Sequence, residues 1–191
     1  MVSRRTLFKR VTAGVLALGA AAALMVVGPS SALATQGYCG LTWGSGAKTL
    51  NPPIMSGQVT DVRAGRHDCY DRLVVDVRAS GVHGYIVQYI DELYQDGSGT
   101  HIPLRGGAKL AVVALADAYD EAGTPTYWPA NRAELVNVAG WQTFRQVAWA
   151  GSFEGTSTVG IGVRARLPFR VSIFDGPAGG SRLVVDVAHF W

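Results

Sequence analysis

The strongest constraint on the fold is a six-residue string, Arg-Leu-Val-Val-Asp-Val, that occurs at residues 72–77 and again at 182–187. Successive side chains of a β-strand point to opposite faces. The leucine and the second and third valines of each copy would therefore share one apolar face, and the arginine and aspartate would share the other. The repeat predicts two equivalent half-buried strands. The charged side chains on their polar faces are Arg72, Asp76, Arg182 and Asp186.

Two placements of these strands are open. We expect each copy to lie in a different sheet of a sandwich, with its apolar face in the shared core and its charges on the outer face. If the copies were instead antiparallel neighbours, Arg72 would oppose Asp186 and Arg182 would oppose Asp76. Within one strand the arginine and aspartate are about 13 Å apart, too far to pair. Each needs either an opposite charge on a neighbouring strand or a ligand, which makes all four candidate ligand-binding residues.

The rest of the chain from residue 58 onward also reads as strands separated by Gly, Pro and Asp turns. The predicted strands are 58–63, 70–79, 84–91, 102–104, 110–115, 135–139, 144–150, 157–164, 169–174 and 182–190. One long connection, 116–134, has room for a helical turn. This pattern predicts an all-β fold, an antiparallel β-sandwich with two similar sheets.

The first 34 residues have the order of an export signal: basic residues, then an apolar run at 11–27, then small residues before Ala34. The run is short for a segment that must cross roughly 30 Å of hydrocarbon. Residues 3–9 resemble a twin-arginine motif, with Leu7 and Phe8 exchanged relative to the usual order. We expect cleavage after Ala34, a secreted product and no transmembrane anchor after processing. An uncleaved amino-terminal anchor is the alternative.

The predicted organisation is a twin-arginine signal peptide at 1–34, an irregular segment at 35–56 and one sandwich domain at 57–191. The leader holds four of the 17 basic residues and none of the 14 acidic ones, so the remainder has 13 basic residues and a net charge of −1. The basic character of the whole chain thus comes from the leader. No basic stripe with interleaved aromatic residues remains, which argues against a nucleic-acid partner.

Two cysteines, Cys39 and Cys69, follow the predicted cleavage site and would meet an oxidising compartment. A disulfide between them is the default expectation. The alternative is a metal site, because His67, Cys69 and Asp71 alternate and would face one side of a strand. Zinc and copper sites generally need a fourth ligand, so we expect no metal and no cofactor.

Aromatic residues in the long connection form a second candidate ligand surface. Tyr127 and Trp128 are adjacent there, and exposed rings on a loop can stack on sugars or hold a peptide. Packing against the sandwich is the competing interpretation. Trp141, Trp149 and Trp191 are expected to pack in the core or at an edge.

Catalytic motifs are not evident. The sequence has no Gly-x-Ser-x-Gly elbow, and its histidines, His67, His83, His101 and His189, do not have the spacing of metal ligands. We therefore expect a protein that is not an enzyme. A metal-dependent wall hydrolase is a weaker alternative that depends on the fold gathering those histidines.

Eight short strings, in order and at characteristic spacing, carry a resemblance to a known family. They lie at 43–45, 65–67, 70–77, 96–99, 153–155, 160–162, 168–171 and 182–189. Together they resemble the AMIN-like domain of secreted actinobacterial proteins. That family is similar to the AMIN domain, a β-sandwich that targets cell-wall amidases to peptidoglycan. Cys39 and Cys69 are not part of the family pattern.

The resemblance implies an exported, non-catalytic module of the cell envelope that binds peptidoglycan or another envelope component through its outer sheet faces. An accessory subunit that binds an envelope protein is the alternative. The sequence does not define the oligomeric state.

Overall fold

The computed structural model describes residues 37–51, 57–78 and 84–191, which contain eleven strands and two 3₁₀-helical turns. The predicted leader and the cleavage position after Ala34 lie outside the described residues. The strands are β1 (Lys48–Leu50), β2 (Gln58–Arg66), β3 (Tyr70–Arg78), β4 (Tyr85–Ile90), β5 (Leu93–Tyr94), β6 (His101–Ile102), β7 (Ala108–Ala114), β8 (Phe144–Phe153), β9 (Thr156–Val163), β10 (Phe169–Asp175) and β11 (Ser181–Ala188). The 3₁₀ turns are η1 (Tyr38–Gly40) and η2 (Pro177–Gly179).

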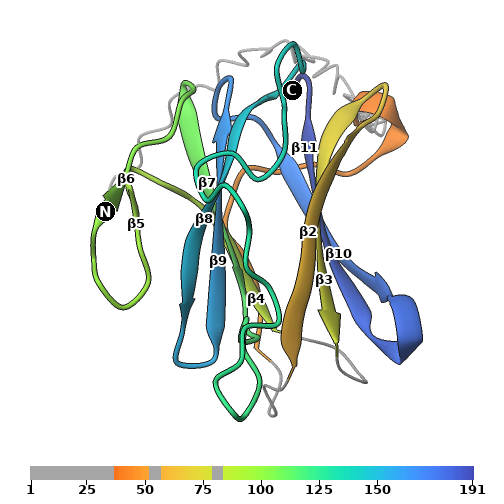
Figure 1. Ribbon diagram of the computed structural model, residues 1–191. Coiled ribbons are helices and arrows are strands. Elements are labelled where there is room, and N and C mark those ends of the chain that lie inside the picture. The colour runs from red at the N-terminus through yellow and green to blue at the C-terminus, as the bar shows by residue number, and fades with distance from the viewer. Residues whose placement is uncertain (1–36, 52–56, 79–83) are drawn as a thin grey trace, which may run out of the picture. The chain divides into compact units, whose positions relative to one another are not determined.

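Two antiparallel sheets face each other and form a sandwich (Figure 1). One has five strands in the order β1-β4-β7-β9-β8, and the other has four in the order β10-β11-β3-β2. The short β5–β6 hairpin is separate from both sheets. The predicted all-β antiparallel sandwich is thus confirmed.

The core lies between the two sheets, where the inward-facing side chains of their strands are apolar. Leu73, Val75, Leu183 and Val185 come from the four-stranded sheet, and side chains of β7, β8 and β9 face them. The largest fully buried side chains include Phe144, Phe169, Leu110 and Ile161. The inward halves of both repeat strands therefore lie where their sequence pattern places them.

The placement of the two repeat strands in different sheets was wrong. β3 and β11 are antiparallel neighbours in the four-stranded sheet, and Arg72 is paired with Asp186 while Arg182 is paired with Asp76. The alternative arrangement is the one observed. An Arg-x-x-x-Asp strand is complementary to its own antiparallel copy, because the register that centres Val74 on Val184 brings each arginine opposite a carboxylate.

Other differences are local. The predicted strand at 135–139 is a loop that runs along β8, where the Leu135 N–H donates to the Val147 carbonyl over 2.8 Å. The long connection before β8 therefore extends to Thr143, and it has no helical turn. β1 and β5 were not predicted, since three and two residues are too few for a pattern to show.

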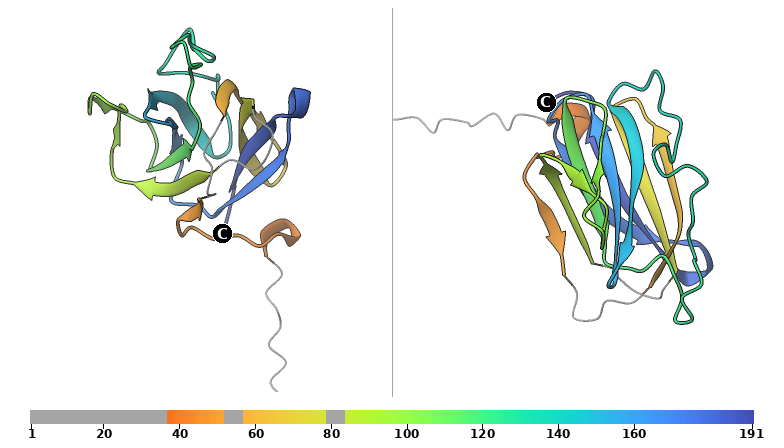
Figure 2. Two further views of the ribbon diagram at one scale, coloured as in Figure 1. Left: turned by 90° about the horizontal axis from the view of Figure 1, so that it is seen from below. Right: turned by 60° about the vertical axis from the view of Figure 1, so that its left-hand side comes forward.

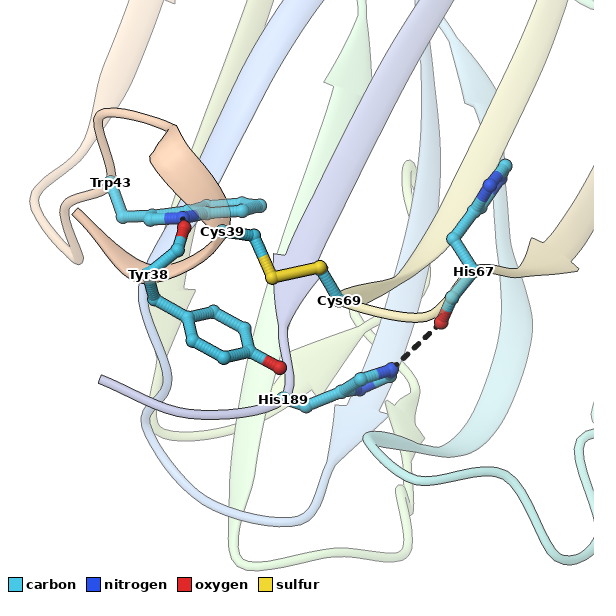
Figure 3. The surroundings of a disulfide bond; sticks show 6 residues. All are labelled: Tyr38, Cys39, Trp43, His67, Cys69 and His189. Carbon is cyan, nitrogen blue, oxygen red and sulfur yellow. Dashed lines mark hydrogen bonds between the residues drawn. A yellow bond between two sulfur atoms is a disulfide. The ribbon is translucent and has the colours of Figure 1, made fainter. Parts of the chain in front are cut away.

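One end of the sandwich gathers the first described segment and the C-terminus. Both views of Figure 2 show the C-terminus beside η1. Tyr38 of η1 packs edge-on against Phe190, with ring centroids 5.7 Å apart. A disulfide joins Cys39 of η1 to Cys69 in the turn between β2 and β3 (Figure 3). The predicted disulfide is confirmed, and it ties η1 to the four-stranded sheet.

Candidate functional site

The outer face of the four-stranded sheet carries two carboxylates, and each is held by two arginines. We call this surface the arginine face; its residues are Arg63, Arg72, Asp76, Arg170, Arg182 and Asp186. The Arg72 guanidinium donates to both oxygens of Asp186, with Nε to Oδ1 at 2.6 Å and Nη2 to Oδ2 at 2.9 Å. From the other side, Arg170 Nε donates to Asp186 Oδ2 over 2.7 Å.

The second carboxylate repeats this arrangement about four residues along the sheet. Arg63 donates to both oxygens of Asp76, with Nε to Oδ2 at 2.9 Å and Nη2 to Oδ1 at 3.0 Å. Arg182 Nε donates to Asp76 Oδ1 over 3.3 Å. Each cluster therefore has one bidentate arginine and one arginine that contacts the carboxylate through Nε. The antiparallel repeat accounts for one arginine of each cluster, since it places Arg72 opposite Asp186 and Arg182 opposite Asp76. The bidentate arginine is Arg72 of the repeat in one cluster and Arg63 of the neighbouring strand β2 in the other.

Burial differs sharply between the two charge types. The Asp186 and Asp76 side chains retain 3% and 9% of their accessible surface, whereas Arg63 and Arg182 retain 46% and 40%. The arginines thus cover the carboxylates and are themselves open to solvent. The hydrogen bond to Asp186 raises the pKa of Arg72, so that group stays charged.

The arginine face has an excess of positive charge. Its four guanidiniums face two buried carboxylates, and a third, exposed carboxylate, Asp61, lies 3.8 Å from Arg63. One positive charge remains uncompensated within this set. A surface with fixed, partly desolvated guanidiniums in excess favours anionic ligands.

A pocket of about 510 Å³ opens on this face. Val74 and Val184, the central pair of the two repeat strands, lie among its lining residues, with Phe174 on the β10 side. Its charged lining comes from Arg63, Arg72 and Arg182. Among the described residues that line it there is no carboxylate, because Asp76 and Asp186 lie beneath the guanidiniums.

Aromatic rings support one end of the face. The Arg72 and Arg170 guanidiniums each lie 5.2 Å from the centroid of the Tyr70 ring. Arg170 also lies 5.4 Å from the centroid of Trp43, the residue shown beside the disulfide in Figure 3. These contacts restrict the two arginines, so their donors are held in place before any ligand binds.

The structure brings together all four charged candidates of the repeat, Arg72, Asp76, Arg182 and Asp186. Sequence reasoning missed Arg63 and Arg170, the second arginine of each cluster. Arg170 alternates with the apolar residues of its predicted strand, whereas strict alternation would put Arg63 on the same face as Val59; a bulge between Val59 and Asp61 brings Arg63 to the outer face. Their pairing with Asp76 and Asp186 depends on which strands are neighbours, and the pattern does not contain that information.

Tyr127 and Trp128 lie at a different place, in a pocket of about 220 Å³ beside the long connection. Tyr127 packs edge-on against the buried Trp149 with ring centroids 5.0 Å apart, and burial raises its pKa to about 12. Trp128 is 71% exposed, with the Arg132 guanidinium 5.4 Å from its ring centroid. The first ring is therefore mainly packed, and the second is available at the surface.

The alternative of a metal site assumed that His67, Cys69 and Asp71 lie on one strand, and this assumption is wrong. His67 and Cys69 lie in the turn between β2 and β3, and the Cys69 sulfur is bonded to Cys39. Asp71 is fully buried, and its Oδ2 accepts hydrogen bonds from the Thr143 and Phe144 amides, both over 2.8 Å. The described residues contain no group of three or more His, Cys, Asp or Glu side chains placed to hold a metal ion.

The expectation that Trp191 packs was also wrong, since this residue is 72% exposed. It lies three residues beyond Ala188, where β11 ends. Trp149 is buried in the core, and Trp141 stacks on Phe144, as expected.

Among the residues that the structure describes, no helix combines the length and the hydrophobicity needed to cross a bilayer. Comparison with curated proteins finds no match to this chain. The model of the AMIN-like domain family matches residues 57–189, which span β2 to the end of β11 and include the whole arginine face. The chain therefore belongs to the AMIN-like domain family.

Proposed function

We propose that this chain is a non-catalytic binding module of the bacterial cell envelope and that it binds peptidoglycan through the arginine face. Membership of the AMIN-like family supports an association with the envelope, because the family resembles a domain that targets amidases to the wall. The predicted leader and the Cys39–Cys69 disulfide favour an extracytoplasmic location, since such bonds persist in oxidising compartments.

The observation that carries the proposal is the pocket over Val74 and Val184 with three guanidiniums around it. Peptidoglycan presents carboxylates on its peptide stems, and arginine binds carboxylates through paired N–H donors. The pocket is thus chemically complementary to the wall polymer. Arginine stays protonated, so these groups are suited to holding an anion rather than to transferring protons.

The test is sedimentation of residues 35–191, a compact unit with its own hydrophobic core, with purified peptidoglycan sacculi. The unchanged protein is expected to sediment with sacculi. Arg72→Ala combined with Arg182→Ala is expected to reduce retention, because both guanidiniums line the pocket. The matched control is Arg105→Ala combined with Arg166→Ala, which removes the same charge from outside the arginine face.

Circular dichroism and thermal unfolding would establish that each variant is folded. Absence of sedimentation by the unchanged protein would reject wall binding. If the unchanged protein instead retained an envelope protein, that result would favour the accessory-subunit function. Equal loss in the two double variants would show that net charge, not the arginine face, controls binding.

A further inference from the structure

The arginines that line the pocket on the arginine face have N–H donors that the fold leaves free. Arg182 donates to Asp76 through Nε, and among the described residues its two terminal nitrogens form no hydrogen bond. Arg63 and Arg72 donate to their carboxylates through Nε and Nη2. Their Nη1 atoms also form no hydrogen bond among the described residues. The fold therefore orients three guanidiniums through their Nε sides and leaves N–H groups for another acceptor.

The charges of its lining residues distinguish this pocket from three other pockets of the described residues. Pockets of about 500, 480 and 300 Å³ have Asp68 and Asp71, Glu134, and Asp91 in their linings, respectively. The pocket on the arginine face has three guanidiniums and His67 but no carboxylate among its described lining residues. An anion entering it meets guanidinium groups at the wall, while Asp76 and Asp186 lie beneath them.

The floor restricts which anion fits. Val74, Val184, Ala64 and Phe174 line the pocket with alkyl and aromatic carbon, and Phe174 is 53% exposed. A phosphodiester-linked sugar polymer would place hydroxyl groups against this carbon surface and lose their hydration. A peptide end with small apolar side chains would place methyl groups there and its carboxylate among the guanidiniums.

We propose that the pocket between Arg63, Arg72 and Arg182 recognises the free carboxylate end of an alanine-rich peptide, as found on peptidoglycan stems. This inference rests on the proposed function and specifies its ligand. The terminal N–H pair of Arg182 binds the carboxylate, the Nη1 groups of Arg63 and Arg72 supply further donors, and the valine pair contacts the alanine methyl groups.

The first experiment changes the ligand and leaves the protein intact. Sacculi whose carboxylates have been converted to neutral methylamides are compared with untreated sacculi. Amidation is expected to weaken binding roughly ten- to a hundredfold, which corresponds to losing charge-assisted hydrogen bonds. Sacculi with acetylated amines, and sacculi stripped of phosphate polymers by hydrofluoric acid, are expected to bind as well as untreated sacculi.

The second experiment uses a synthetic peptide ending in two D-alanines, as the free acid and as the carboxamide, with binding followed by calorimetry. Only the free acid is expected to bind. Arg182→Gln is expected to abolish that preference, Arg182→Lys to retain part of it because the charge remains, and Arg105→Gln to leave it unchanged.

The outcomes separate the two proposals. If untreated sacculi bind but amidation has no effect, the carboxylate inference is wrong while wall binding stands. If binding disappears after phosphate polymers are removed, the pocket's ligand is a phosphate polymer and the inference is again wrong. If untreated sacculi do not bind, the proposed function fails, and the peptide comparison still decides the inference by itself.

Discussion

The two outer faces of this sandwich differ: one is covered by another part of the chain, and the other is open to solvent. On the five-stranded sheet, the outward positions of β8 and β9 are small: Ala148, Ala150, Gly160 and Gly162. The chain between β4 and β7 packs over them, and Leu93 and Leu104 contact the alanines. On the four-stranded sheet, the outward positions of β3 and β11 include Arg72 and Arg182, whose side chains remain partly open to solvent.

In this sandwich the face with small outward side chains is covered, and the face with long ones is not. Glycine allows a backbone to approach closely, and a Cβ on Gly162 would meet the Arg105 carbonyl oxygen. Arginines extend over their own sheet and bury carboxylates beneath them. One face thus carries a second hydrophobic cluster, and the other is left as a surface at which a ligand can bind.

The largest expected effect tests the covered face. Gly162→Ala is expected to destabilise the fold by about 3 kcal/mol, because the neighbouring backbone oxygen cannot move aside as a flexible side chain would. Urea denaturation of residues 35–191 measures the change. Gly65→Ala is the matched control on the arginine face, where the nearest atom to the added carbon is 3.9 Å away. Similar losses in the two variants would remove the distinction between the faces.

A smaller effect is expected from the buried carboxylates. Asp186→Ala leaves Arg72 and Arg170 without their shared partner, which typically costs about 3 to 5 kcal/mol for a fully buried pair. Since both arginines are about a quarter exposed, solvent screening reduces the expected loss to about 2 kcal/mol. Thermal and urea unfolding would measure it.

Glu92→Gln supplies the comparison from the other side of the molecule. Glu92 is an exposed carboxylate whose pKa is lowered by hydrogen bonds from Lys109 and His101. Its removal is expected to have little effect on stability near neutral pH, because exposed ion pairs contribute little. An effect as large as that of Asp186→Ala would contradict the role assigned to burial.

A third effect, smaller than that of Asp186→Ala, concerns the interior that both faces share. The Tyr89 hydroxyl donates to the Leu167 carbonyl over 2.6 Å, and burial raises its pKa to about 12 from an ordinary value of 10.0. Its stabilising contribution is complete below pH 10 and is lost as pH rises from about 10 to 12, because the unfolded chain ionises first.

Tyr89→Phe should therefore flatten the alkaline loss of stability and cost about 1 kcal/mol at neutral pH. Urea unfolding at a series of pH values measures both effects. An unchanged alkaline slope would assign that loss to other groups, of which Tyr127 has a similarly raised pKa.

Much of the fold could be predicted from the local alternation of apolar and polar residues. Alternation in 72–77 and 182–187 identified which side chains point inward, and Leu73 and Leu183 are both buried in the core. This succeeds because the period of two is a property of the strand itself. The loop at 135–139 was mistaken for a strand because its apolar residues pack on the core without joining a sheet.

The sequence by itself determined that two identical strands each bury one face and show an arginine and an aspartate on the other. Only the tertiary structure decided that they are neighbours, and that Arg63 and Arg170 complete the two clusters. The physical reason is range: side-chain direction is set within one strand, whereas the Arg72–Asp186 contact joins residues 114 positions apart. The local pattern is satisfied whether the two repeat strands lie in different sheets or side by side. The pairing of all strands in the sheet therefore selects between these arrangements.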